Sequence, residues 1–376
     1  WEPLAESLRD LLADKDVRDP AAERLARRVA GEGSDRDKAR RLYHWVLENV
    51  EDTDDVFGLA PAMLAGRTGD RTRVLGYLLS LIGIDSRLLL ARDVGSDQTR
   101  SELADQDTYD HPLLELAGGD EPLYLSTGQR GASFGYLPPA LRGQDAIVLA
   151  EGAPCVELPP LEPGQDPHRY VVYVELRRDG SAHLKVVETL RGAGAVMWRN
   201  NLEGVPDATL EERFGSQYVA RLVPGAELAA LEIEGRDAPE EPLVMRYEFD
   251  VGSLGRRHGD RWMVPPLFTN DLAPVYARTD QRDTAQLVVP PVDTRVALRL
   301  HAPEGASLPP APQDVELEGP GGARFTRTAE QKGETLVINR RMWMPIVRVA
   351  PQAYPDFAEY CRTVDEAEAR ELPLRL

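Results

Sequence analysis

The hydrophobic pattern of this chain changes its period once, across a segment rich in proline and glycine. Before this segment the chain opens with amphipathic helices, in which apolar residues recur at three- and four-residue spacing. Residues 151–168 contain five prolines and two glycines, and after them apolar residues alternate in short runs. The change predicts a first domain at 1–150, a linker at 151–168 and a strand-rich domain at 169–376.

Helices of the first domain are expected at 1–13, at 20–30, after a Ser34 cap and after an Asp70 cap. In the last of these, one apolar face is formed by Val74, Leu75, Leu78, Leu79 and Ile82, which predicts a helix running to about Gly83. The polar stretch 93–110 is interpreted as an exposed loop, and Gly-Gly-Asp-Glu at 118–121 as a hairpin turn.

The second domain is predicted to be an antiparallel β-sandwich, which makes the whole chain α+β. Residues 170–176 and 182–187 flank Arg-Asp-Gly at 178–180, a strong hairpin signal. A helical interruption is expected at 206–222. Further strands are expected at 226–234, 243–251, 285–289, 295–300, 323–330 and 335–341.

Composition excludes several classes of partner. At 376 residues the chain is long enough for two or three domains with their own cores. The net charge of −19 argues against a nucleic-acid partner and against anionic membrane surfaces, because both need a concentrated basic face. No run approaches the roughly 18 apolar residues that a membrane span requires. Because the chain begins at Trp1, we expect it to be a processed or shortened form of the native protein.

No cofactor and no metal site are expected. The acidic run Glu51–Asp55 lacks the alternating oxygen ligands and the glycine of a calcium loop, so we interpret it as a solvated loop at a helix end. Cys155 and Cys361 support neither a disulfide framework nor a zinc site. Two reduced thiols are the expected state, and a bridge between them in an oxidising compartment is the alternative.

The segment Gly69-Asp70-Arg71, with its helix and the following Gly-Ile turn, resembles the nucleophile segment of bacterial transglutaminase-like proteins, which have a papain-like fold. That family has Gly-Asp-Cys, so Arg71 stands in place of the cysteine. Residues 109–116 resemble the family's histidine strand, which puts His111 at the position of the base. Residues 123–128 resemble the strand that carries the orienting aspartate, so Ser126 stands in its place.

This resemblance implies a transglutaminase-like core without its chemistry. A cysteine in the first turn of a helix is activated by the positive end of the helix dipole, whereas an arginine has no nucleophilic lone pair to offer. We therefore expect no catalytic residue, and regard Arg71, His111 and Ser126 as vestigial triad positions. A hydrogen bond from Arg71 to Ser126 or to the backbone is expected to fill the former cleft.

The implied function is a protein- or peptide-binding or scaffolding module of a bacterial envelope protein, periplasmic or, as the alternative, cytoplasmic. The second half resembles the β-sandwich module that follows the core in the same family, on Gly180-Ser181, Leu190-Arg191-Gly192 and Tyr354 to Phe357. A hydrolase or acyltransferase that uses Ser126 or Thr72 with His111 as base is an alternative. The hydroxyl of Thr72 is expected to point away from the slot of Arg71, because a helix turns about 100° per residue. A purely structural subunit is a third hypothesis, and the oligomeric state is left open.

Overall fold

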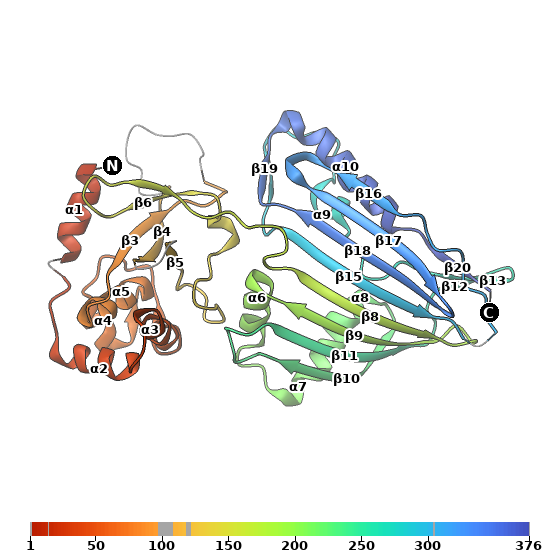
Figure 1. Cartoon of the computed structure of the whole chain (residues 1–376), viewed down its shortest axis with the longest axis horizontal. Helices are drawn as coiled ribbons and strands as arrows, with labels where there is room; N and C mark the ends of the chain where they lie inside the picture. The colour runs from red at the N-terminus through yellow and green to blue at the C-terminus, as the bar shows by residue number, and fades with distance from the viewer. Residues whose placement is uncertain (1, 14, 97–107, 118–121, 304, 376) are drawn as a thin grey trace. The chain divides into compact units, whose positions relative to one another are not determined.

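The computed structural model describes residues 2–13, 15–96, 108–117, 122–303 and 305–375, and it divides the chain into two compact units, Trp1–Leu161 and Glu162–Leu376 (Figure 1). Helices and sheets occur in both units, so the chain is α+β. The predicted hairpin turn at 118–121 and most of the predicted loop at 93–110 lie outside the described residues. The boundary between the units falls within the predicted linker, but residues 155–157 of that linker form a strand of the first unit.

The helices described in the first unit are α1 (Glu2–Ala13), α2 (Pro20–Ala30), α3 (Asp35–Asn49), α4 (Ala60–Gly66) and α5 (Arg71–Leu81). Helices α3 and α5 follow the predicted caps Ser34 and Asp70, whereas α4 was not predicted. The Ser34 hydroxyl accepts a hydrogen bond from the backbone N–H of Asp37 at 3.2 Å, and the Asp70 carboxylate accepts one from the N–H of Arg73 at 2.8 Å. Each cap satisfies a backbone donor that has no partner inside its own helix.

An antiparallel sheet of five strands completes this unit. In the order β5–β4–β3–β6–β7, its strands are Leu123–Leu125, His111–Leu116, Ser86–Ala91, Asp145–Val148 and Cys155–Glu157. Two short strands, β1 (Glu51–Asp52) and β2 (Thr68–Gly69), pair in parallel beside it. Most residues of helix α5 are buried, although Ser80 is exposed. Gly76 allows close packing, because an added Cβ would lie 3.3 Å from Leu114.

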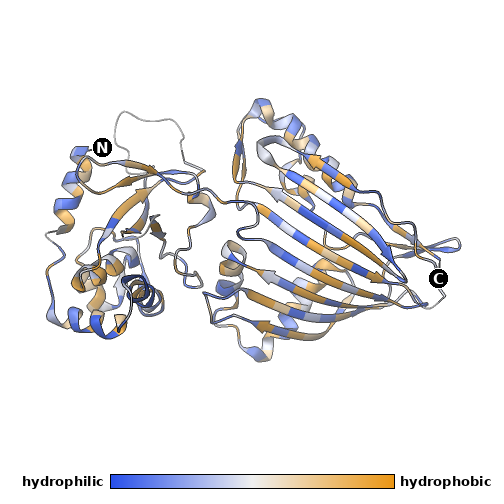
Figure 2. Ribbon diagram, in the orientation of Figure 1, coloured by the Kyte–Doolittle hydropathy of each residue, from blue (hydrophilic) through white to orange (hydrophobic). Residues whose placement is uncertain are grey.

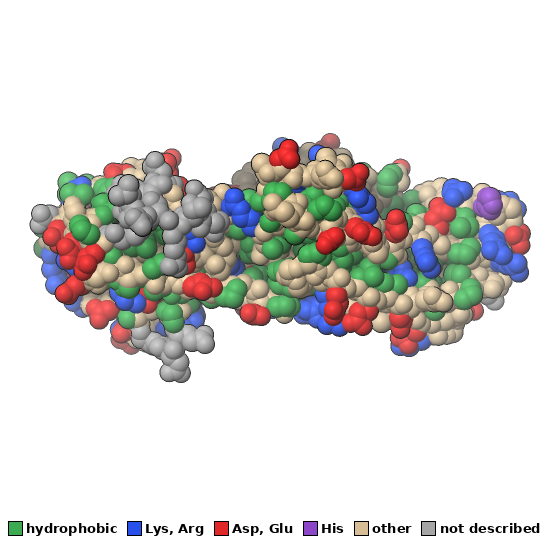
Figure 3. Space-filling model, turned by 90° about the horizontal axis from the view of Figure 1, so that it is seen from above, with side chains coloured by type: hydrophobic (Ala, Val, Ile, Leu, Met, Phe, Trp, Pro, Cys, Tyr) green, Lys and Arg blue, Asp and Glu red, His purple; other side chains and the backbone are tan. Residues whose placement is uncertain are grey.

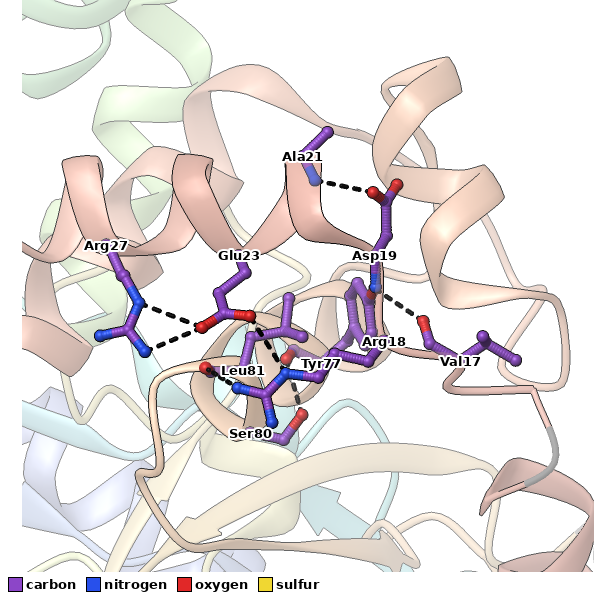
Figure 4. A network of polar contacts seen from close by, with 9 residues as sticks. All are labelled: Val17, Arg18, Asp19, Ala21, Glu23, Arg27, Tyr77, Ser80 and Leu81. Atoms are coloured by element: carbon purple, nitrogen blue, oxygen red, sulfur yellow. Dashed lines mark hydrogen bonds and ion pairs between the residues drawn. The ribbon is translucent and has the colours of Figure 1, made fainter.

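A polar network fixes α5 against the segment that precedes α2 (Figure 4). The Tyr77 hydroxyl donates to the carbonyl oxygen of Val17 at 2.9 Å and accepts from the N–H of Asp19 at 3.1 Å. The guanidinium of Arg18 donates to the carbonyl oxygen of Leu81 at 3.2 Å and pairs with Glu23. These bonds tie the last turns of α5 to the rest of the unit, so the N-terminus of α5 is held in a fixed place.

The second unit is built on one sheet of eight strands. Its order is β10–β11–β9–β8–β15–β18–β17–β16. The strands are β8 (His168–Leu176), β9 (Ala182–Leu190), β10 (Ala226–Glu234), β11 (Leu243–Val251), β15 (Val292–His301), β16 (Val315–Glu318), β17 (Arg324–Lys332) and β18 (Thr335–Met344). Two antiparallel groups of four strands meet at the central pair β8 and β15, which is parallel.

Helices and short strands cover one face of this sheet. The helices are α6 (Gly192–Leu202), α7 (Asp207–Arg213), the π-helix η2 (Phe214–Val219), α8 (Ala220–Leu222), α9 (Leu272–Tyr276) and α10 (Tyr354–Glu368). The short strands form the sheets β12 (Arg256–His258), β13 (Arg261–Val264), β20 (Leu372–Leu374) and β14 (Gln286–Val288), β19 (Val347–Val349). Buried side chains of these elements pack on the inward residues of the large sheet.

The prediction of an antiparallel β-sandwich is therefore wrong for this unit. The large sheet contains a parallel pair, and its covering layer consists of helices and short strands instead of a second large sheet. Hydropathy alternates along its strands (Figure 2), and this alternation led to the error. Apolar residues at every second position indicate that one face of a strand is buried, but they do not indicate which elements cover that face.

Candidate functional site

A cleft of about 710 Å³ lies in the first unit, where the N-terminus of α5 meets the ends of β4 and β5. One side of the cleft is lined by residues of the β1 region (Asp52, Thr53, Asp54, Val56, Phe57) and of α5 with its cap (Asp70, Thr72). The other lining residues lie in β3, in β4 and just before β4 (Leu90, Tyr109, Asp110, His111, Pro112), and in the segment after β5 (Ser126, Thr127, Gly128, Gln129). The last three, Pro138, Ala140 and Leu141, belong to the 3₁₀-helix η1 (Pro139–Leu141) or directly precede it. The cleft thus brings together two of the three predicted positions, His111 and Ser126, together with Thr72.

Arg71 does not line the cleft. Its side chain is only 3% exposed, and its Nε donates to the carbonyl oxygen of Val50 at 2.8 Å. One Nη1 hydrogen bond goes to the carbonyl oxygen of Thr127, at 3.4 Å. The expected bond from Arg71 to the backbone is therefore present, but it does not fill the cleft. Arg71 instead joins two segments next to the cleft, because its side chain donates to the backbone of both.

Thr72 occupies the place in the cleft that the sequence analysis assigned to Arg71. Its hydroxyl does point away from Arg71, as the helical rotation predicts, but that direction is into the cleft. The Thr72 Oγ1 lies 2.8 Å from the Oγ1 of Thr127, and one of the two hydroxyls donates to the other. At the N-terminus of α5, where the helix dipole is positive, the side chain that lines the cleft is therefore that of a threonine and not that of an arginine.

Arg73 also turns away from the cleft. Its guanidinium binds both carboxylate oxygens of Asp16, at 2.6 and 3.1 Å, and its Nε donates to the carbonyl oxygen of Val56 at 3.0 Å. The side chain is 6% exposed. Both arginines of the Arg-Thr-Arg motif therefore act as anchors, because each joins the first turn of α5 to the backbone of the segment that forms one wall.

His111 is the first residue of β4, and its side chain is 43% exposed. Its Nε2 lies 3.4 Å from a carboxylate oxygen of Asp110 and 3.6 Å from one of Asp93. Although burial raises the pKa of Asp93, hydrogen bonds from Ser96 and Gly95 and the charge of His111 lower it overall. A carboxylate beside a histidine can orient its imidazole, and the carboxylates next to His111 are those of Asp110 and Asp93.

Ser126 continues the line of β5 and is 8% exposed. Its carbonyl oxygen accepts a hydrogen bond from the Tyr43 hydroxyl at 2.8 Å. Leu125 pairs with Leu114, so Ser126 lies opposite Leu113 and on the same face as His111, one diagonal step away. The register therefore directs both side chains to the same side of the sheet, where both line the cleft.

The cleft is acidic. Asp52, Asp54, Asp70 and Asp110 line it, and no lysine or arginine does so among the described residues. Burial, assisted by the charge of Asp52, raises the pKa of Asp70 to about 6. Burial also raises the pKa of Asp52, where the charge of Asp54 acts in the same direction. Carboxylates with raised pKa values in a concave site are typical of functional sites.

Sequence reasoning missed this acidic wall. The run Glu51–Asp55 is exposed, as expected of a solvated loop, but residues 51 and 52 also pair with Thr68 and Gly69. That pairing brings Asp52 to the cleft, where it accepts a hydrogen bond from the N–H of Arg71 at 3.2 Å. The run of charges was the only signal in the sequence, and a run of charges is more often solvated.

Neither cysteine of the chain contributes to the cleft. The two cysteines belong to different units and are not bridged in the structure. Cys155 is exposed on β7, whereas Cys361 is buried in α10, and burial raises the pKa of its thiol to about 12. In the part of the chain that the structure describes, no group of three His, Cys, Asp or Glu side chains is arranged to hold a metal ion, and no helix is long and apolar enough to cross a bilayer.

Comparisons with known proteins support the fold and leave the activity open. Residues 260–374 match a family described as "Domain of Unknown Function with solved-structure structure (DUF3858)". A crystal structure of a "putative protease" from Parabacteroides distasonis is similar over 99% of this chain, with a TM-score of 0.57 and 13% sequence identity. This chain spans 59% of the length of that protein. No curated protein matches the chain.

Proposed function

We propose that the first unit is a transglutaminase-like domain whose cleft binds a peptide or protein segment without cleaving or cross-linking it. The observation that carries the proposal is a cleft of about 710 Å³ that contains a histidine and a helix N-terminus but no thiol. The order of the motifs around Asp70, His111 and Ser126 supports the family. The similarity to a protein described as a protease supports the fold.

Acyl transfer in this family begins with a thiolate, and the cleft offers only hydroxyl groups in its place. A threonine or serine needs a hydrogen-bonded base to become a nucleophile. The Thr72 hydroxyl bonds to that of Thr127, a neutral group that cannot accept its proton at neutral pH. Binding requires no such activation, since the carboxylates, hydroxyls and aromatic side chains of the cleft can contact a peptide directly.

The partner and the compartment follow from the resemblance. The resemblance is to proteins that pair this domain with β-sandwich modules, and on that resemblance we propose a protein or peptide partner in the bacterial envelope. The whole protein's activity belongs to the same proposal, because the chain spans only part of the length of the solved structure that it matches.

Two glycines allow a test of the binding role. Selection of a random peptide library on the full chain yields probe peptides, whose affinities are then measured for two variants. Gly128 lines the cleft, and an added Cβ there meets no atom within 4 Å, so Gly128→Trp places a large side chain in the cleft without a clash at Cβ. Gly252, in the other unit, is equally unobstructed, and Gly252→Trp is the control.

We expect Gly128→Trp to reduce the affinity of the selected peptides at least tenfold, and Gly252→Trp to leave it unchanged. Equal affinity for both variants would place the binding outside the cleft and contradict the proposal. Circular dichroism of both variants verifies that each one is folded, so that a loss of affinity reports the cleft alone.

One observation favours a second candidate, a hydrolase or acyltransferase that uses Ser126. Ser126 and His111 lie on the same face of the sheet, and Asp93 and Asp110 flank the histidine. A fluorophosphonate probe would then label Ser126, and His111→Ala would abolish labelling. Labelling that persists in Ser126→Ala, or that does not occur, rules this candidate out.

A further inference from the structure

Three arginines form one row across the centre of the large sheet in the second unit. Arg295 of β15 pairs with Arg169 of β8 on one side and with Arg341 of β18 on the other. Residues that are paired in this way point to the same face, with their Cβ atoms about 5 Å apart. The row continues at both ends with threonines, Thr189 of β9 and Thr326 of β17.

The row lies on the face opposite the helices. The neighbours of these arginines along the strands, such as Val296 and Met342, are buried in the core, so the arginines point the other way. Arg169 and Arg341 are exposed, and neither side chain makes a hydrogen bond or an ion pair with any residue that the structure describes. The side chain of Arg295 is 30% exposed.

The charges of the row are not balanced within the unit. Asp293 is a neighbouring carboxylate, with one oxygen 3.7 Å from the Nε of Arg295 and the other accepting from the N–H of Gly164 at 2.6 Å. The Arg295 Nε is buried without a hydrogen-bond partner. Like charges directly opposite one another in a sheet are destabilising. Two of the three positive charges therefore remain uncompensated in a chain whose net charge is −19.

Gly164 holds the middle arginine in place. This glycine has a φ of +85°, and an added Cβ would lie 2.3 Å from one terminal nitrogen of Arg295 and 3.7 Å from one of Arg341. The backbone of the loop therefore rests directly on the guanidinium of Arg295. The central arginine is restrained, while the outer two are free to turn toward a ligand.

We propose that Arg169, Arg295 and Arg341 bind the phosphate group of a small soluble ligand on the open face of the sheet. Guanidinium groups form paired, charge-assisted hydrogen bonds to phosphate oxygens, and adjacent strands present them about 4.8 Å apart. The threonine hydroxyls at both ends of the row add neutral donors. This site is independent of the cleft and of the function proposed for it.

The charge distribution on this face favours a small ligand over a polymer or a membrane. The edge strands β10 and β16 carry carboxylates on the same face, among them Glu232, Glu234 and Glu316. A long polyanion or a lipid surface would meet these charges on both sides of the row. Figure 3 shows another side of the molecule, where basic side chains are also interspersed with acidic ones.

Thermal unfolding of the full chain in phosphate, compared with chloride at equal ionic strength and pH, tests the proposal. Glycerol 3-phosphate is the second probe, and calorimetric titration gives the affinity of each. We expect both probes to raise the Tm above its value in chloride. Arg341→Gln or Arg169→Gln should weaken binding about tenfold or more, because each removes a charge-assisted pair.

The control is Arg246→Gln, which removes an exposed arginine of the same face that is already paired with Glu234 at 2.8 Å. It should bind phosphate as the unmodified chain does. An equal Tm in phosphate and chloride, or an equal loss of affinity in the control, would overturn the proposal. Binding to phosphatidic acid vesicles without a response to glycerol 3-phosphate would also overturn it, in favour of a lipid surface.

Discussion

The arginines behind the cleft and those on the open face of the large sheet are used in opposite ways. In the first unit Arg71 and Arg73 are buried and donate to backbone carbonyls and Asp16, and the concave surface in front of them is lined with carboxylates. In the second unit Arg169 and Arg341 are exposed on an open sheet face without partners among the described residues. An arginine that stabilises the fold is therefore distinguished from one that can bind a ligand by its burial and its hydrogen-bond partners, not by its residue type.

Replacing a buried arginine gives the largest effect that this comparison predicts. We expect Arg71→Ala to lower the free energy of unfolding by about 3 kcal/mol, because it leaves two buried carbonyl groups without their donor and removes the ion pair with Asp52. Urea unfolding of the full chain, followed by pulse-labelled hydrogen exchange of residues 71–81, measures it. A loss below about 0.5 kcal/mol would mean that Arg71 is no anchor.

The stability of the first unit should fall as the pH rises through the titration of Asp70. Its pKa is about 6 in the folded chain against an ordinary value of 3.8. The favourable contribution of the protonated form is thus fully present below pH 3.8 and is lost as the pH rises through about 6. A pKa difference of this size corresponds to roughly 3 kcal/mol in the free energy of unfolding.

Asp70→Asn isolates this effect, because asparagine caps a helix as well as aspartate does. The variant should lack the decline between pH 4 and 7, and at pH 7 it should be more stable than the unmodified chain by up to about 3 kcal/mol. The same unfolding measurement at several pH values gives both curves. A variant that is less stable at pH 7 would show that the carboxylate is stabilised in its charged form.

A matched pair of cysteine substitutions can determine which residue of the α5 terminus faces the cleft. In a Cys155→Ser background, Thr72→Cys should react with iodoacetamide at least tenfold faster than Arg71→Cys, because only position 72 lines the cleft and the helix N-terminus favours the thiolate. Mass spectrometry of the modified chain follows both rates. Faster reaction at position 71 would restore the assignment made from the sequence.

The smallest effect is expected on the open sheet face. In chloride without phosphate, Arg341→Gln should change the free energy of unfolding by less than about 0.5 kcal/mol, because the side chain is exposed and unpaired. Urea unfolding of the full chain measures it beside Arg71→Ala. A loss as large as that of Arg71 would make Arg341 a structural residue and remove the contrast between the open sheet face and the arginines behind the cleft.

Local signals predicted much of the fold. The Asp70 and Ser34 caps and the strand at 243–251 were predicted where the structure has them, because caps and alternation act over a few neighbouring residues. The prediction of a β-sandwich was wrong because the elements that pack on a sheet come from segments distant in the sequence. The parallel pairing of Arg169 with Arg295 was likewise hidden, since no local pattern encodes which strands meet across the sheet.

The candidate site was predicted in part for the same reason. The strand register brings His111 and Ser126 to one face, as their motifs indicated. The direction of Arg71 could not be read from the sequence, because it depends on the carbonyl groups of Val50 and Thr127, which the fold brings together from distant segments. Asp93 as a partner of His111 was missed, since the motif located the acid at position 126.

The central claim is that the cleft binds without catalysing acyl transfer. Incubation of the full chain with a glutamine peptide and a labelled amine donor, beside His111→Ala, tests it most directly. The account predicts that neither chain incorporates the amine or releases ammonia above the level of buffer. Turnover by the unmodified chain that His111→Ala abolishes would contradict it, because a nucleophile would then be active in the cleft without a thiol.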